Sequence, residues 1–335
     1  FSIRPGVERV RKRRMRMMEI LRTIRPWEYM IVSGSKETPS DELHECAKNG
    51  SEKDLRECMA REGFHIDREN KDGETCLMVA VRQNRPDIIK AIIKLKARID
   101  AYGKAGTTAL HMSAMMGHMS PAKLLIEAKA DLTVAVANVD GNDNAHNIHL
   151  PLNALVLSLM HDESAIARLL LESKADPNVA GSKETNEVTN ESLSSSSRPL
   201  RPLHFAVRVG NVDIIQLLVE YKAYLDVSSE ILDGNTPLGY ASRKGKMKLA
   251  QALLECKADP NAATKTARHT GMKPLHFAAL GNHPHVIKLL IEHGAERTAK
   301  DANGKNAVDF AIERGSFEAT TILDPSQVYA SSCSD

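Results

Sequence analysis

The string GYASRKGKM, residues 239–247, comes closest to a site that could do chemistry. A phosphate-binding loop has four residues between its glycines and a Lys followed by Ser or Thr, because these groups hold phosphate and Mg²⁺. Here five residues separate Gly239 from Gly245, and Met247 follows Lys246. The sequence also contains no motif typical of a serine hydrolase, a zinc peptidase or a protein kinase. We therefore expect a protein that is not an enzyme, with no catalytic residues, no cofactor and no small-molecule substrate.

Histidines crowd between residues 269 and 293, which makes them the candidates for a metal site. His283 and His285 flank Pro284, and no Cys is near them. Zinc ligands normally come as two spaced pairs, so we expect exposed or capping histidines and no metal site, with adventitious metal binding as the alternative. The five cysteines are scattered without a CxxC, which predicts a reducing compartment and no disulfide framework.

The chain shows no sign of membrane insertion or secretion. No apolar run reaches the roughly 18 residues that a transmembrane helix needs, and no secretory signal is visible. We expect an intracellular protein, cytoplasmic first, with the nucleus or an organelle after cleavage of a targeting segment as alternatives. Because the chain begins with Phe1, we expect a fragment or a processed form. Its 335 residues, 42% of them apolar, are enough for a substantial core.

A short motif centred on Leu recurs along the chain and indicates the elements that must position every side chain. Examples are ETCLMVA at 74, LPLNALV at 150 and KPLHFAA at 273, and weaker copies lie at 42 and 306. The marker residues are spaced by 33, 42, 51, 35 and 37 positions, and they are Leu77, Leu110, Leu152, Leu203, Leu238 and Leu275.

Each unit contains two helical patterns separated by a break at Gly or Asn. The second pattern carries an apolar stripe, as in IIQLL at 214–218. Two helices of about ten residues cannot bury such a stripe alone, so the units must stack on one another. The pattern predicts strand only in the hairpins between units. It predicts antiparallel helix pairs over 75–96, 108–129, 151–174, 202–222, 236–257 and 273–294.

The order of turn, PLHxAxxxG helix and LLxxxADxN exit resembles the ankyrin repeat family, as in RPLHFAVRVGNVDIIQLLVEYKAYLD from 201. The resemblance implies an all-α solenoid of stacked helix-turn-helix units over 42–324, with six full repeats and a weak cap unit at each end. A tail follows at 325–335. It also implies protein–protein binding through the turn edge and the inner helices, as a scaffold, an adaptor or a structural subunit of a larger assembly. The alternatives are the regulatory or targeting part of a longer enzyme, and a module that tethers lipid or nucleic acid.

The family's turn histidine, which ties the turn of one repeat to the next, matches His111, His204 and His276. We expect looser loops where another residue replaces it, and the replacements are Met78, Asn153, Gly239 and Asp309.

Lysine stands where the family usually ends its second helix on Gly. The position is left-handed in many helix ends, which costs a non-Gly residue about 1 kcal/mol or more. Two interpretations stay open for the backbone: a left-handed Lys helped by the helix dipole, or a tighter turn that avoids positive φ. Helix capping and a basic ladder that contacts an acidic partner are the alternatives for its role. The Lys column comprises Lys96, Lys129, Lys174, Lys222 and Lys257, and Gly294 keeps the glycine.

Two long insertions separate units of the array, at 134–150 and 179–200. Both follow the same structural position, so we expect long finger loops that protrude from one edge. They are either tolerated extensions, since loop growth costs little, or contacts to a partner.

The N-terminal segment 1–32 has a composition unlike the rest of the chain. Residues 1–30 carry nine Arg or Lys and three Glu, a net +6, whereas the whole chain is +2. We expect a basic amphipathic helix, followed by a linker at 33–41 with Ser40 or Asp41 capping the next helix. This helix could cap the first repeat, dock on a partner protein, or contact a membrane surface or nucleic acid. Its candidate partner-binding residues are Arg9, Arg11, Lys12, Arg13, Arg14, Arg16, Met17, Leu21 and Trp27.

Overall fold

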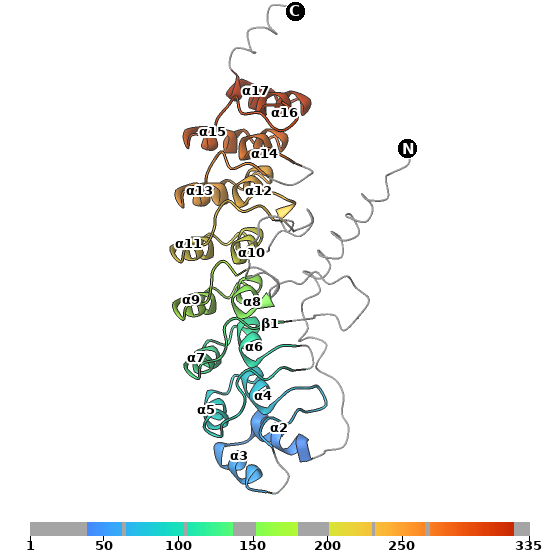
Figure 1. The fold of residues 1–335 in the computed structure, drawn as a ribbon, viewed down its shortest axis with the longest axis vertical. Helices are drawn as coiled ribbons and strands as arrows, with labels where there is room; N and C mark the ends of the chain where they lie inside the picture. Colours follow the sequence, from blue (N-terminus) through green and yellow to red (C-terminus); the bar gives the residue numbers. More distant parts are fainter. Residues whose placement is uncertain are drawn as a thin grey trace, which may run out of the picture.

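The computed structural model describes residues 39–61, 65–103, 106–136, 152–179, 201–229, 232–264 and 269–324. Sixteen helices within these ranges form consecutive pairs (Figure 1). In chain order, the pairs are α2 (Pro39–Asn49) with α3 (Glu52–Met59), α4 (Cys76–Arg82) with α5 (Pro86–Lys94), α6 (Ala109–Met116) with α7 (Met119–Glu127), α8 (Ala154–Met160) with α9 (Ser164–Glu172), α10 (Pro202–Val209) with α11 (Val212–Glu220), α12 (Pro237–Arg243) with α13 (Met247–Glu255), α14 (Pro274–Leu280) with α15 (Pro284–Glu292), and α16 (Ala307–Glu313) with α17 (Phe317–Leu323).

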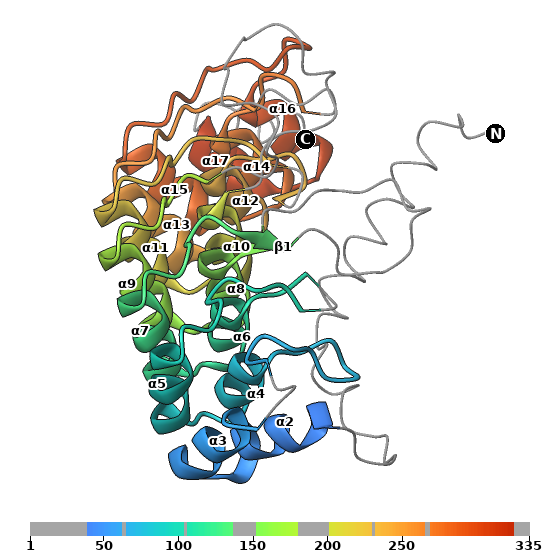
Figure 2. The same ribbon diagram turned by 60° about the horizontal axis from the view of Figure 1, so that its bottom comes forward.

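The pairs stack in chain order into an elongated two-layer array. The first helix of each pair packs against the first helix of the next pair, and the second helices do the same (Figures 1 and 2). The expected all-α solenoid and its six helix pairs are therefore confirmed. The strand within the described ranges is confined to the loops between units. Strand β1 (Ala135–Val136) pairs antiparallel with β2 (Leu152–Asn153), and one isolated bridge joins Ser229 to Asn235.

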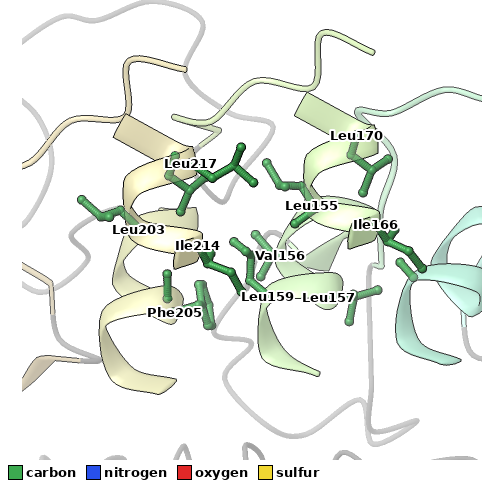
Figure 3. Close-up of a cluster of buried hydrophobic side chains, with 14 of the residues drawn as sticks. Leu155, Val156, Leu157, Leu159, Ile166, Leu170, Leu203, Phe205, Ile214 and Leu217 are labelled. Carbon is green, nitrogen blue, oxygen red and sulfur yellow. The ribbon is translucent and has the colours of Figure 1, made fainter. Parts of the chain in front are cut away.

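The core lies between the two layers and between successive pairs. In α11, Ile214, Ile215, Leu217 and Leu218 are buried, as the apolar stripe predicted. Figure 3 shows Ile214 and Leu217 of this stripe beside buried side chains of α8, α9 and α10. Each pair therefore covers the apolar surface of its neighbour, which explains why helices of seven to nine residues are stable in this array.

The register of the repeat that begins with α8 differs from the sequence prediction by three residues. Asn153 is the residue before the helix, and its side chain accepts a hydrogen bond from the Val156 N–H. By this register the marker leucine is Leu155, whereas Leu152 belongs to β2, and Val156 replaces Asn153 at the turn-histidine position. The motif was misplaced because LPLNALV contains leucines three residues apart, and the strong preference of Asn for the position before a helix decides between them.

The start of the array also differs from the prediction. Helix α2 begins at Pro39, so the end of the expected 33–41 linker is helical, and the helix starts before Ser40 and Asp41. Proline is favoured at the first helical position because its φ is preset and its missing N–H would be unpaired there. The basic segment 1–32, linker residues 33–38, most of both insertions and the tail 325–335 lie outside the described residues.

The Lys column adopts the left-handed conformation. Of the two interpretations of its backbone, the left-handed Lys is therefore correct and the tighter turn is wrong. The φ angles lie between 62° and 70° at Lys96, Lys129, Lys174, Lys222 and Lys257. At the end of α5, the Lys96 N–H donates to the Ile93 carbonyl and the Ala97 N–H donates to the Ile92 carbonyl. This pair of bonds satisfies the last carbonyls of the helix, as in a Schellman motif, and the buried Ala97 packs below it. All five lysines are exposed, so their ammonium groups meet the negative end of the helix dipole at the surface.

The left-handed lysines generate a stability prediction. Replacing Lys96 with Gly should raise the free energy of unfolding by about 0.5–1 kcal/mol, because removal of the left-handed strain exceeds the entropy that Gly adds to the unfolded chain. Lys90→Gly, within the same α5 helix, is the matched control and should lower it by about 1 kcal/mol. Urea unfolding measures both, and a destabilised Lys96→Gly variant would contradict the strain argument.

Candidate protein-binding surface

Three turn histidines hold the loops between units in the same way. In each, Nδ1 accepts the N–H of the residue before the helix, and Nε2–H donates to a carbonyl 23 residues further on. The carbonyls belong to Val134 for His111, Val227 for His204 and Ala299 for His276. Each imidazole thus links the start of its own helix to the loop that follows the same helix pair.

Burial keeps these imidazoles neutral. It lowers the pKa of His111 and of His204 to about 4, and it lowers the pKa of His276 as well. A neutral imidazole whose two nitrogens are both engaged by the backbone is a structural group and not a general acid or base. At the replaced positions the links differ: Met78 packs its thioether near Gly103, and Asp309 accepts the N–H of Asn306. That these loops are looser remains a prediction.

A second set of polar links between units was missed at the sequence level. A side-chain oxygen in the loop after one second helix accepts the backbone N–H that follows the next second helix. The pairs are Asp67 with Arg98, Asp100 with Asp131, Asn178 with Tyr224, Asp226 with Asp259, and Asn261 with Glu296. The Asn of the ADPN strings at 175 and 258 was the available signal, because short polar side chains bond neighbouring backbone.

The described residues offer little for covalent or metal chemistry. The Sγ atoms of Cys46 and Cys58 lie 3.2 Å apart, and burial raises the pKa of Cys46 to about 12. Burial also raises the pKa of Cys76 to about 12, so these thiols are protonated at neutral pH and are poor nucleophiles. Within the described ranges, no group of three or more His, Cys, Asp or Glu could hold a metal ion.

The exposed face of the first-helix layer carries apolar side chains over α6 and α8. Met112, Met115 and Met116 on α6 and Met160 on α8 are all partly exposed, although Met112, Met115 and Met160 also pack against the core. We call these four residues the methionine strip. Thioether side chains are flexible and polarizable, so a surface built from them adapts to the shape of a bound chain. The position of Met115 and Met160 is occupied by Arg208 on α10 and by Arg243 on α12, the next two units.

The two insertions leave from the same structural position, the loop between a second helix and the next first helix. Residues 137–151 begin and end at the β1–β2 pair. For the second insertion, the guanidinium of Arg201 donates to the Asn178 carbonyl, which joins the described ends on either side of 180–200. The expected protrusion of the loops themselves, like the predicted site residues from Arg9 to Trp27, falls outside the described residues.

Comparisons with known proteins agree with this geometry. A family model described as ankyrin repeats, in three copies, matches residues 43–136, 181–264 and 262–328. The chain belongs to the ankyrin repeat family. In the solved structures, the human ASB11 ankyrin repeat domain superposes with a TM-score of 0.54 at 23% identity, covering 75% of this chain and 98% of that one. At that identity the likeness concerns the fold.

The curated relatives are longer proteins that differ in activity. E3 ubiquitin-protein ligase KEG of Arabidopsis thaliana is 23% identical over 279 residues, which cover 77% of this chain and 17% of the relative. Palmitoyltransferase AKR1 of Candida glabrata is 32% identical over 118 residues, covering 33% of this chain and 14% of the relative. The chain thus spans less than a fifth of either relative. Ankyrin repeats are protein-interaction modules, and some enzymes carry them.

No helix in the described part of this ankyrin repeat chain is both long and apolar enough to cross a bilayer.

The buried turn histidines predict a specific pH dependence. Because the pKa of His204 is about 4 in the folded protein and 6.5 when unperturbed, the unfolded chain takes up the proton first as the pH falls. The stability contributed by the neutral imidazole is complete above pH 6.5 and declines toward pH 4, by an amount on the order of 2–3 kcal/mol. His204→Gln should therefore lower the free energy of unfolding most at pH 7. The difference in this free energy between the variant and the wild type should be smaller at pH 5.

Met78→Gln serves as the control for this experiment, because Met78 occupies the equivalent turn position and does not titrate. Its destabilisation, measured by urea unfolding at each pH, should stay constant between pH 7 and pH 5. A constant gap for His204→Gln as well would show that the buried imidazole is not the titrating group.

Proposed function

We propose that this chain is a non-catalytic module that binds protein through the exposed face of its first-helix layer and the loops between its units. The methionine strip is the observation that supports this proposal most directly. Met115 and Met116 keep partly exposed apolar surface at the end of a helix whose other faces are packed. Apolar surface of this kind is stabilised when a partner removes it from water, at about 25 cal/mol per Å².

The proposed role is that of a scaffold, an adaptor or a structural subunit of a larger assembly. Nearly parallel stacking places equivalent side chains of successive first helices in rows, so a partner can be contacted by several units at once (Figure 1). The insertions that leave at β1–β2 and at Asn178 would extend this surface on the loop side.

The alternative is that the chain is the regulatory or targeting part of a longer enzyme. The ubiquitin ligase and palmitoyltransferase relatives support this possibility, since the chain matches only a small share of each. A full-length transcript discriminates between the two: an added catalytic domain would favour the alternative, and repeats alone would favour the scaffold.

The basic segment 1–32 is proposed as a second contact region, ahead of the repeats and joined to them by the linker. Its net positive charge contrasts with a negative remainder of the chain. A partner protein that covers Met17, Leu21 and Trp27 and pairs with the arginines fits this composition. A membrane surface or nucleic acid are the alternatives, and weaker binding at raised salt is expected for either.

The first test of the proposed function uses the methionine strip. The partner is captured with the wild-type chain, identified by mass spectrometry, and titrated by calorimetry. Met115→Glu with Met116→Glu should weaken its binding by about tenfold or more, because two charges would enter an apolar contact. Gln216→Glu with Gln251→Glu changes the charge equally at exposed positions of the second-helix layer and should bind as the wild type does. Equal affinity of all three proteins would refute the proposed binding face.

The second test concerns the basic segment. Replacing Met17, Leu21 and Trp27 with Ser should weaken partner binding while the melting temperature of the repeats changes little, because the partner covers this apolar face. The opposite result, a much lower melting temperature with unchanged binding, would mean that the segment caps the first repeat. Circular dichroism and calorimetry on the same samples separate the two outcomes.

A further inference from the structure

Cations gather where α10 and α12 end and α13 begins. Arg208 lies in the last turn of α10, Arg243 and Lys244 lie at the end of α12, and Lys246 and Lys248 flank the first residue of α13. We call these five residues the basic cluster. Three of them, Arg243, Lys244 and Lys246, lie in the string that came closest to a phosphate-binding loop, a function that its spacing does not support.

The cluster is built around Tyr240. The Nζ atoms of Lys244 and Lys246 lie 5.9 and 5.7 Å from the centroid of its ring. Lys246 also extends toward Gly210 at the end of α10, since a Cβ added there would lie 3.4 Å from its Nζ. The tyrosine face thus collects cations from both sides of the turn, so that α10 and α12 present one charged surface.

Carboxylates balance only a part of this charge. Nη1 of Arg243 lies 3.7 Å from Oδ2 of Asp233. For Lys244 and Lys246, the described part of the chain provides no carboxylate within ion-pair distance. Both side chains are at least partly exposed, so a bound anion could reach them.

Folding stability does not account for two of these cations. Lys246 is the residue before α13, makes no capping hydrogen bond, and is followed by Lys248 in the first turn. The start of a helix is the positive end of its dipole, where cations are unfavourable. Arg85 likewise precedes α5, but it forms an ion pair with Asp87 of the first turn, and Lys53 in the first turn of α3 lies between Glu52 and Asp54. The first turn of α13 has no acidic residue to offset its two lysines, and this difference indicates a role outside folding.

Exposed apolar side chains border the cluster. Val209, beside Gly210, is 46% exposed, and Met247, between the two lysines of α13, is 39% exposed. A partner that combines carboxylates with an apolar side chain would match both features.

We propose that the basic cluster binds an acidic segment of a partner protein, with carboxylates on Lys244 and Lys246 and an apolar side chain against Val209 or Met247. This inference rests on the proposed function, since it names the chemistry of the partner for the end of the first-helix face and the turn that leads into α13. An acidic peptide fits better than a nucleic acid, because the Nζ atoms of Lys244 and Lys246 lie 5.9 and 5.7 Å from the Tyr240 ring centroid, where they would compete with a stacking base. It fits better than a lipid surface, because Val209 and Met247 are single exposed apolar side chains and not the broad apolar face that a membrane-surface helix buries.

The test uses a short fluorescein-labelled peptide that repeats Glu-Asp-Leu, with a Gln-Asn-Leu repeat as its uncharged counterpart. Fluorescence anisotropy on the full chain should show that the acidic peptide binds, that salt weakens it, and that the uncharged peptide binds at least tenfold more weakly. Lys244→Glu with Lys246→Glu should lower the affinity for the acidic peptide by about tenfold or more, because two attractive contacts become repulsive.

The matched control reverses the same charge elsewhere. Lys90→Glu with Lys288→Glu alters exposed lysines of α5 and α15 and should leave the affinity within about twofold of the wild type. Equal loss in both double variants would overturn the proposal, because the overall field of the protein would then explain the binding. Equal melting temperatures of the two double variants show that neither effect is due to unfolding.

Other occupants of the cluster are also tested. One outcome is that the wild type binds phosphatidylserine vesicles and not the acidic peptide. If Lys244→Glu with Lys246→Glu then abolishes vesicle binding, the proposal is overturned in favour of a lipid. Sedimentation velocity tests for self-association. If the wild type is a dimer and Lys244→Glu with Lys246→Glu is a monomer, the proposal is overturned in favour of a second copy of the chain. A third outcome is that the acidic peptide does not bind, while Met115→Glu with Met116→Glu still lowers the affinity for the captured partner. The assignment of the basic cluster is then wrong and the proposed function stands. If the peptide result holds and the methionine variant has no effect, the cluster is the binding site and the methionine strip is not.

Discussion

None of the eight described helix pairs can bury its own apolar stripe, and this constraint determines the rest of the structure. Ile214 and Leu217 of α11 are buried because the neighbouring pairs cover them. The pairs must therefore stack in one fixed orientation, and the polar links enforce it. The His204 imidazole fixes the loop after α11 to the start of α10, and the Asn178 side chain fixes one exit loop to the next. Burial supplies the stability, whereas these bonds select a single arrangement of neighbours.

Stacking of this kind tolerates long insertions, because contacts between helix pairs do not depend on the length of the loop that joins them. Helix α8 packs against α10, although residues 180–200 separate α9 from α10 in the sequence. Loop closure grows only logarithmically with length, so the added cost is small. At both insertions, the structure restores the ordinary spacing at the base, by the β1–β2 pair in one case and by the Arg201 bond to the Asn178 carbonyl in the other.

The sequence predicted the elements that depend on periodicity and missed those that depend on geometry between units. The recurring leucines and the IIxLL stripe gave the helix pairs, because helical spacing of apolar residues is visible in any single unit. Leu152 was chosen over Leu155 because both satisfy the spacing, and only the cap formed by Asn153 decides between them. The Asp and Asn links were missed because each joins residues more than 30 positions apart. For the candidate site, the exposed faces of Met115 and Tyr240 follow from the stacking, which no single unit reveals.

Comparison among equivalent positions separates residues that serve the fold from residues that serve binding. The turn histidine, the left-handed Lys and the Asp or Asn links recur from unit to unit, and each has a local energetic reason. Cations at the start of α5 and α3 have acidic residues beside them, whereas Lys246 and Lys248 at the start of α13 have none in the first turn. Their charge is unfavourable at that helix end, and their neighbours Val209 and Met247 remain exposed. A repeat array supplies its own internal reference, because every unit solves the same packing problem. A departure that costs stability in one unit only is therefore best explained by a contact that the array makes with something else.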